Sequence, residues 1–114
     1  MKARSRTRRA SISSVAALDE MIEEAIVDAY GSSEQITGFY TMLDEHLAVP
    51  FKTVVLGVAA TVTRVDVTTD GQIVAVCVRG RSRQRIPILD LPLPDPPPPG
   101  AEWIEAYRRW AHQR

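Results

Sequence analysis

The stretch 58-VAATVTRVDVTTDGQIVAVCV-78 decides the fold, because it predicts two β-strands joined by a tight turn. Residues 58–67 and 72–78 are rich in Val, Ile and Thr, which favour strands. Asp70-Gly71 between them is a strong hairpin signal. The apolar alternation changes phase inside the first strand, which indicates a bulge near residues 63–64.

Two further strands flank this hairpin. Residues 53–56 and 84–89 have the same Val, Ile and Thr bias. The strands lie too close together in the chain for crossover helices, so we expect mostly antiparallel pairing. Residues 51–91 therefore predict a small antiparallel sheet or barrel of about four to five short strands.

The chain before the strands predicts two amphipathic helices over residues 13–48. Ser13 or Ser14 can cap the first helix, Gly31 can end it, and Pro50 closes the second. The apolar residues recur at spacings of three and four, as on one face of a helix. They are Val15, Leu18, Ile22, Ala25, Ile26 and Ala29, and then Ile36, Phe39, Tyr40, Leu43 and Leu47.

The chain after the strands predicts a stiff connection and a last helix. Residues 92–99 contain six prolines, which cannot continue a helix or donate to a ladder, so we expect an extended strap. Residues 100–113 then predict a helix that packs back on the domain. Its aromatic face consists of Trp103, Ile104, Tyr107 and Trp110, which would be costly to expose.

These segments make an α+β fold of two N-terminal helices, a small antiparallel β unit and a C-terminal helix. The 114 residues are enough for one domain, which we place at 13–114, after a disordered basic arm over 1–12. No stretch is long and apolar enough for a membrane span or a signal peptide, so we expect a cytoplasmic protein. Cys77 is the only cysteine, and its apolar neighbours indicate a buried structural thiol.

Negative charge is concentrated in the helical part. Between residues 19 and 45 there are eight acidic residues and no Lys or Arg. Carboxylates this dense repel one another, and a hard cation such as Ca²⁺ would relieve the repulsion. No EF-hand loop is present, and the alternative is a solvated acidic face. The eight residues are Asp19, Glu20, Glu23, Glu24, Asp28, Glu34, Asp44 and Glu45.

Positive charge is concentrated in the N-terminal arm and after the third predicted strand. Arg79, Arg81, Arg83 and Arg85 fall on every second residue, which places them on one face of an extended chain. Such a stripe can bind phosphate, together with the arm. The alternative is that the stripe neutralises the acidic helices within the same fold.

An enzyme is not expected. His46 and His112 are the only histidines, and neither has the spacing of a metal site or a nucleophile motif. The chain also lacks a glycine-rich phosphate loop.

Two segments resemble a known family. They are residues 24–51, EAIVDAYGSSEQITGFYTMLDEHLAVPF, and 79–110, RGRSRQRIPILDLPLPDPPPPGAEWIEAYRRW. Both are similar to the small bacterial proteins related to the cyanobacterial calcium-binding protein, many of which carry a calcium-binding or plasmid-related label. The cyanobacterial protein is strongly acidic overall, whereas this chain has a formal net charge of zero.

The resemblance implies an α+β domain that binds Ca²⁺ through surface carboxylates and acts as a buffer or sensor. Asp44 and Glu45 fall where the cyanobacterial protein has an acidic pair before its Pro-Phe, so they are the first candidate ligands. Glu24, Asp28 and Glu34 of the acidic segment complete the candidate set. The alternative function is a small interaction module that binds nucleic acid or an acidic protein through the arginines.

Overall fold

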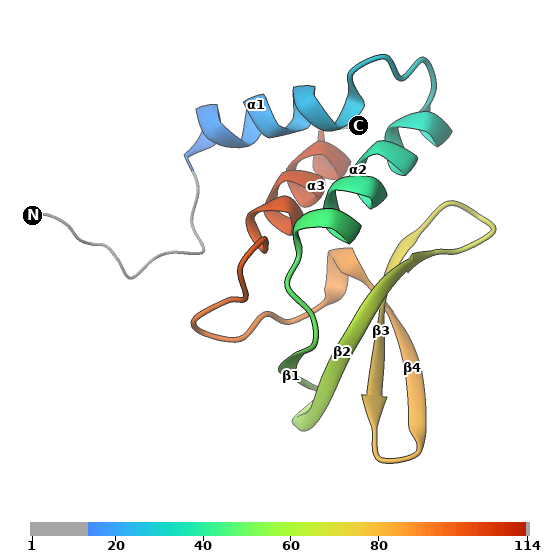
Figure 1. Cartoon of the computed structure of the whole chain (residues 1–114), viewed down its shortest axis with the longest axis vertical. Coiled ribbons are helices and arrows are strands. Elements are labelled where there is room, and N and C mark those ends of the chain that lie inside the picture. The colour runs from blue at the N-terminus through green and yellow to red at the C-terminus, as the bar shows by residue number, and fades with distance from the viewer. Residues whose placement is uncertain (1–13, 114) are drawn as a thin grey trace, which may run out of the picture.

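The computed structural model describes residues 14–113 and folds them as two helices, a four-stranded sheet and a last helix (Figure 1). This α+β architecture confirms the predicted fold class. The predicted arm over 1–12 lies outside the described residues. The elements are α1 (Val15–Ile26), α2 (Ser32–His46), β1 (Phe51–Val55), β2 (Val58–Val67), β3 (Ile73–Arg79), β4 (Ser82–Pro87), the 3₁₀ turn η2 (Ile88–Asp90) and α3 (Glu102–His112).

The four strands form an open antiparallel sheet in the order β1-β2-β3-β4, and not a closed barrel. Asp70-Gly71 lies at the tip of the β2–β3 hairpin, where Gly71 donates its backbone N–H to the Thr68 carbonyl at 3.0 Å. The pairing of β2 with β3 shifts register between Val62 and Arg64. The predicted hairpin and the predicted bulge are therefore both confirmed.

The outer strands begin two residues earlier than predicted. β1 starts at Phe51, and β4 starts at Ser82 and ends at Pro87. The Gly80-Arg81 turn sets the start of β4, because Arg79 pairs directly with Ser82 across it. The Leu56-Gly57 turn ends β1 at Val55, which pairs directly with Val58.

The helices cover one face of the sheet, which we call the inner face. On β3 this face carries Ile73, Ala75 and Cys77, which are buried in the same core as the apolar residues of all three helices. On β2 the inner face carries Ala60, Val62 and Val65, of which Val62 is fully buried. Cys77 is a buried thiol, as predicted, and burial raises its pKa. The core therefore lies between the inner face and the helices.

The first helix ends earlier than predicted. α1 stops at Ile26, and Asp28 adopts a left-handed conformation with φ of 64°. Aspartate tolerates this conformation better than most residues, so the chain leaves the helix at Asp28 and not at Gly31. Asp28 therefore does not continue the helical face that carries Glu20 and Glu24.

The terminal helix packs on the core as predicted. Trp103, Ile104, Tyr107 and Trp110 are all buried. The Phe39 ring of α2 lies 5.4 Å from the Tyr107 ring and 5.1 Å from the Trp110 ring, measured between centroids. This aromatic cluster joins α3 to α2.

The proline strap is tied at both ends. The Thr53 hydroxyl of β1 donates to the Pro92 carbonyl, and the Ala48 backbone N–H donates to the Pro99 carbonyl at 2.8 Å. The Arg108 guanidinium of α3 binds the Ile88 and Leu91 carbonyls just before the strap. These bonds fix the path from the sheet to α3.

Candidate functional site

The acidic residues of the helical part are almost all on the surface. Asp19 pairs with Arg109 of α3, with Nε and Oδ1 2.8 Å apart, and this contact raises the pKa of Arg109. The other seven are exposed, and none of them forms an ion pair with a cation in residues 14–113. We call these seven the acidic surface: Glu20, Glu23, Glu24, Asp28, Glu34, Asp44 and Glu45.

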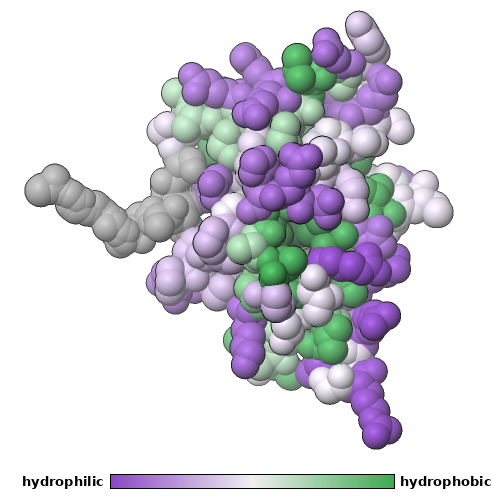
Figure 2. All heavy atoms as spheres, viewed as in Figure 1, coloured by the Kyte–Doolittle hydropathy of each residue, from purple (hydrophilic) through white to green (hydrophobic). Residues whose placement is uncertain are grey.

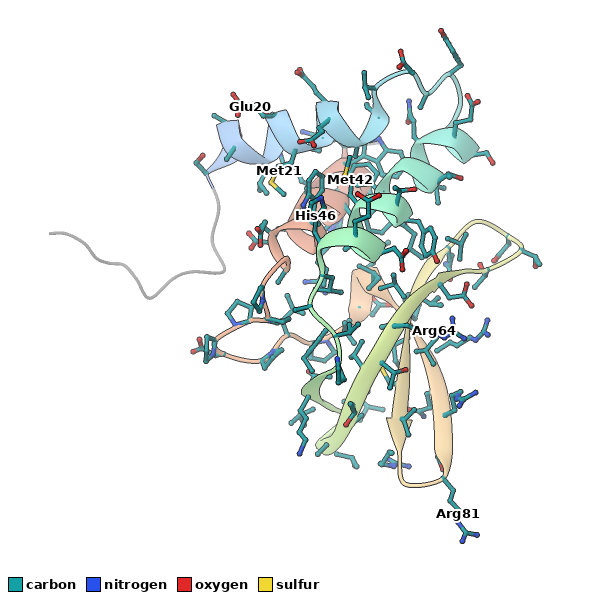
Figure 3. All side chains as sticks on the ribbon, viewed as in Figure 1. Glu20, Met21, Met42, His46, Arg64 and Arg81 are labelled. Atoms are coloured by element: carbon teal, nitrogen blue, oxygen red, sulfur yellow. The ribbon has the colours of Figure 1, made fainter. Side chains whose placement is uncertain are left out.

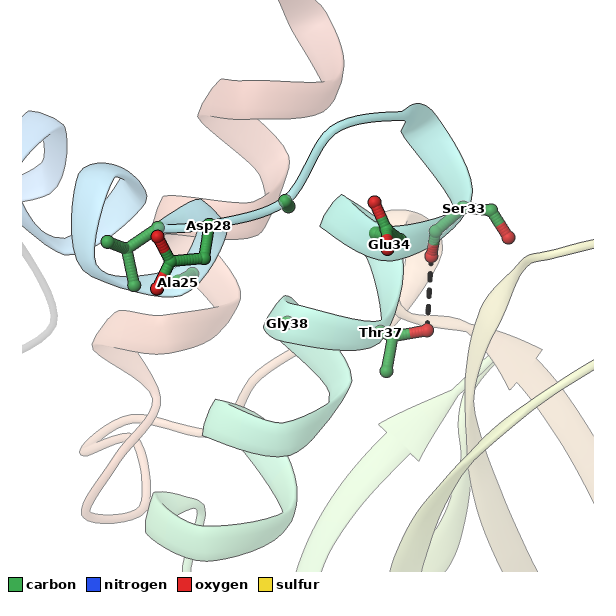
Figure 4. A pocket seen from close by; sticks show the side chains of 8 residues that line it. Ala25, Asp28, Ser33, Glu34, Thr37 and Gly38 are labelled. Atoms are coloured by element: carbon green, nitrogen blue, oxygen red, sulfur yellow. Dashed lines mark hydrogen bonds between the residues drawn. The ribbon is translucent and has the colours of Figure 1, made fainter.

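A pocket of about 340 Å³ lies where α1 leads into α2 (Figure 4). Asp28 and Glu34 of the acidic surface both line it. The close approach of the helices depends on Gly38, because a Cβ at this position would lie 2.0 Å from the Ala25 carbonyl oxygen. Glu34 is oriented by the chain itself, since its Oε1 accepts the Tyr30 backbone N–H at 2.8 Å.

The local charge of this pocket favours a cation. Ala25 and Val27 at the end of α1 form part of its lining, and a helix C-terminus carries partial negative charge. The N-terminus of α2 contributes the opposite partial charge, which the first-turn carboxylate of Glu34 offsets. Asp28 then adds a second carboxylate with no described counter-charge.

The donor set suits calcium in chemistry but is incomplete in number. Ca²⁺ takes six to eight oxygen ligands. No three Asp, Glu, His or Cys residues within 14–113 come together as a metal cluster. Figure 4 shows Asp28 and Glu34 at different sides of the pocket and not directed at one point. The residues present therefore fit a loosely held, largely hydrated ion and not a preformed cage.

The other predicted ligands lie elsewhere. Asp44 and Glu45 are exposed in the last turn of α2. Asp44 lines a small hollow together with Arg64, whose positive charge opposes a metal ion there. Glu24 is exposed on α1 and does not line the pocket of Asp28 and Glu34. The fold thus brings together two of the five candidate ligands.

The four arginines do not form one stripe. Gly80 and Arg81 make the turn between β3 and β4, so the chain reverses within the predicted extended segment. Arg83 and Arg85 pair with Val78 and Val76 and lie on the sheet face away from the helices, which we call the outer face. Arg79 ends β3 in phase with the inner face, so the prediction that all four share a face was wrong.

The outer face also carries Arg64, which the spacing of the other arginines does not predict. The bulge in β2 places Arg64 opposite Val76, on the same face as Arg83 and Arg85. Asp66 lies between these cations, 3.2 Å from Arg64 and 3.5 Å from Arg85. The Val67 backbone N–H and the Arg64 side chain lower the pKa of Asp66. The phase change in β2 was the signal that could have placed Arg64 here.

α1 and the β3–β4 turn lie at opposite ends of the molecule, whereas Arg64 lies between them and shares a hollow with Asp44. Figure 3 shows Glu20 on α1 at one end and Arg81 on the β3–β4 turn at the other. Arg64 and Arg85 pair with Asp66, and Arg109 pairs with Asp19. The β3–β4 arginines are thus not the counter-charge of the acidic surface.

Comparison with known protein families identifies the family of this chain. A protein-family model described as calcium binding, that of the CcbP type, matches residues 19–111. The chain belongs to this calcium-binding family. The CcbP-type family is not an enzyme family, and the match spans the acidic surface, the sheet and α3.

The resemblance found in the sequence is thereby confirmed at the level of the family. The searches of curated proteins and of solved structures returned no match. Among the described helices, none has the length and apolar character needed to cross a membrane.

Proposed function

We propose that this protein binds Ca²⁺ weakly through its acidic surface, with Asp28 and Glu34 of the α1–α2 pocket as the principal ligands. The observation that carries the proposal is that seven exposed carboxylates have no cation partner within residues 14–113. Of these, Asp28 and Glu34 share a pocket. Membership of a calcium-binding family supports the choice of metal.

The chain's own residues define what each ligand contributes. The Glu34 carboxylate uses Oε1 for the Tyr30 N–H, and a carboxylate has about four lone-pair sites, so it can accept a cation as well. Asp28 presents its side chain from a left-handed turn position outside the helix. Bound Ca²⁺ would neutralise these charges, with water supplying the remaining oxygens.

The role that fits this arrangement is a buffer. A sensor needs an element with two arrangements that calcium binds unequally. α1 and α2 already meet closely at Gly38 and Ala25, and their apolar faces are buried in the core. We therefore expect calcium to change surface charge and stability more than conformation.

Calcium should raise the thermal stability of the protein. For a site with Kd on the order of 10⁻⁵ to 10⁻³ M, a tenfold excess of free Ca²⁺ adds about 1.4 kcal/mol to the free energy of unfolding. We expect Tm to rise by several degrees in calcium relative to chelator. The double variant Asp28→Asn/Glu34→Gln should lose most of that rise, as calorimetric unfolding would measure.

The matched control is Asp44→Asn/Glu45→Gln, which removes the same charge from the end of α2. It should keep most of the calcium-dependent rise in Tm. If the control loses the rise and the pocket variant keeps it, the site lies at the end of α2, where the family resemblance places it. An identical Tm in calcium and in chelator for the unmodified protein contradicts calcium binding altogether.

A second candidate function is supported by the outer face. Arg64 and Arg85 have half-exposed side chains there, Arg83 lies beside them, and Asp66 is the one acid that pairs with them in the described chain. This basic face, on the side of the sheet away from the helices, suits an anionic partner such as nucleic acid or an acidic protein.

Duplex DNA is the probe for this second function. We expect weak retention at about 50 mM salt and steep loss by about 200 mM, because phosphate contacts release counterions. Arg83→Gln should weaken retention more than Arg79→Gln, which makes the same charge change in phase with the inner face. Equal effects of the two variants, measured by fluorescence anisotropy, would show that only total charge matters. If DNA does not bind at low salt, nucleic acid is excluded as the partner and an acidic protein is the remaining candidate.

A further inference from the structure

An unusual leucine lies at the tip of the β1–β2 hairpin. Leu56 has a φ of 51°, a left-handed conformation that is unfavourable for a bulky side chain. The two-residue turn Leu56-Gly57 needs a positive φ at both positions, for which Asn-Gly is the favoured pair. Leu56 is also 97% exposed. Strain and full exposure of an apolar side chain at one residue point to a contact that the isolated chain does not make.

The strand next to Leu56 has a free edge. β1 is the first strand of the sheet and pairs only with β2. Because Val55 and Val58 close the turn, the alternation of an antiparallel ladder directs the backbone N–H and C=O groups of Lys52 and Val54 away from β2. In residues 14–113 no backbone or side-chain group bonds to these outward groups.

Apolar surface surrounds this edge. Val49 is 40% exposed and Val54 is 54% exposed. A hollow of about 260 Å³ lies between the strand and the proline strap. It is lined by Lys52, Thr53, Val54 and Ala59 of the hairpin and by Pro92, Leu93 and Pro94 of the strap. Figure 2 shows hydrophobic residues over the β1–β2 hairpin, next to the hydrophilic tip of the β3–β4 hairpin.

We propose that two copies of the chain associate through their β1 strands, antiparallel about a twofold axis centred on Thr53. In this register Lys52 of each copy lies opposite Val54 of the other, so no two like charges face each other. Leu56 lies opposite Pro50 of the second copy, beside the exposed Val49. The strained leucine and the free edge are then parts of one interface.

The other edge of the sheet explains why β1 is the pairing strand. β4 presents Arg83 and Arg85 at its outward-directed positions, since Arg79 and Ser82 close its turn. Self-pairing of β4 would place these arginines opposite one another, and charged edge strands resist pairing. β1 carries a single cation, Lys52, whose long stem can lie along apolar surface with the ammonium in water.

The expected association is weak. One five-residue strand with a small apolar patch is less than the roughly 1,600 Å² of a standard stable interface. A dissociation constant on the order of 10⁻⁴ M is therefore expected. When two β1 edges pair about a twofold axis, each supplies partners for the outward N–H and C=O groups of the other. No β1 edge is then left free, so the assembly stops at two copies.

Amide hydrogen exchange and sedimentation at increasing protein concentration test the proposal. The Lys52 and Val54 amides should become protected as the dimer forms, while the Arg83 and Arg85 amides stay unprotected. Leu56→Asn should weaken the dimer at least about tenfold, while the favourable Asn-Gly turn keeps the fold intact. The control Leu89→Asn removes another exposed leucine and should leave association unchanged.

Each contrary outcome overturns the proposal. A monomer at about 1 mM, with fast exchange at Lys52 and Val54, means that the edge pairs with no second copy and that Leu56 serves another partner. If both the β1 and the β4 amides become protected, β1 of one copy pairs with β4 of the next, and the copies form an open chain instead of a dimer. If Leu56→Asn leaves the association as strong as before, Leu56 is not part of the interface.

Discussion

Replacing Trp103 by alanine should lower the free energy of unfolding by about 3–5 kcal/mol, the usual cost of truncating a buried tryptophan. Trp103 is 6% exposed and stacks on His46 of α2, with ring centroids 5.6 Å apart. Truncation leaves a cavity where the strap turns into α3, which the surrounding helices cannot fill. At about 4–8 °C per kcal/mol for a domain of this size, Tm should fall by more than about 12 °C.

The matched control is Glu102→Ala, the preceding and exposed residue of α3. It should change the stability by about 0.5 kcal/mol or less. Chemical denaturation of the two variants measures the difference. A Trp103→Ala variant as stable as Glu102→Ala would mean that α3 contributes little to the domain.

Gly100→Ala is expected to have a comparable effect for a different reason. Gly100 has a φ of 88°, and a Cβ there would lie 2.0 Å from the His46 carbonyl oxygen and 2.7 Å from the Leu47 Cα. The left-handed conformation costs a non-glycine residue about 1–2 kcal/mol, and overpacking costs typically about 1–3 kcal/mol more. We therefore expect a loss of about 2–5 kcal/mol, because the atoms it meets are backbone and cannot rotate aside.

Gly80→Ala separates the two costs. Gly80 also has a positive φ, 57°, but a Cβ there meets nothing within 4 Å. This control should cost only the conformational part, about 1–2 kcal/mol. Equal losses for the two variants, measured by the same denaturation experiment, would show that the contact between Gly100 and the end of α2 is not tight.

The elements that the sequence predicted well are those with a strong period. The aromatic face of α3 and the Asp70-Gly71 hairpin were correct because burial and turn geometry both leave few alternatives. The bulge in β2 was also predicted, from a change of apolar phase. The same change of phase places Arg64 on the outer face, opposite Val76.

The predictions were wrong where the conformation of a single residue decides the path of the chain. Gly31 looked like the end of α1, yet Asp28 already takes the left-handed position, so the apolar spacing that continues to Ala29 was misleading. The spacing of the arginines predicts one extended strand. Gly80 allows a two-residue turn instead, so that Arg79 pairs with Ser82. Arg83 and Arg85 then lie on the opposite side of the sheet from Arg79, whereas in one uninterrupted strand they would lie on the same side.

The calcium ligands were the least predictable part. Eight acidic residues that are close in sequence need not converge in space. The burial of its apolar face determines how each helix is oriented, and its carboxylates then point wherever that orientation directs them. Asp28 and Glu34 share a pocket only because the chain reverses between α1 and α2. Asp44 and Glu45 were candidate ligands because of the family resemblance. They lie in the last turn of α2, away from the pocket that Asp28 and Glu34 line.

The most direct test of the calcium proposal is to follow the backbone amide resonances of isotopically labelled protein during a titration with Ca²⁺. We expect saturable shifts centred on residues 27–34, reaching half-saturation between about 10⁻⁵ and 10⁻³ M, with the β3–β4 hairpin unaffected. Unchanged resonances in that segment at about 10 mM Ca²⁺, well above the affinity of loosely organised carboxylate sites, would contradict it.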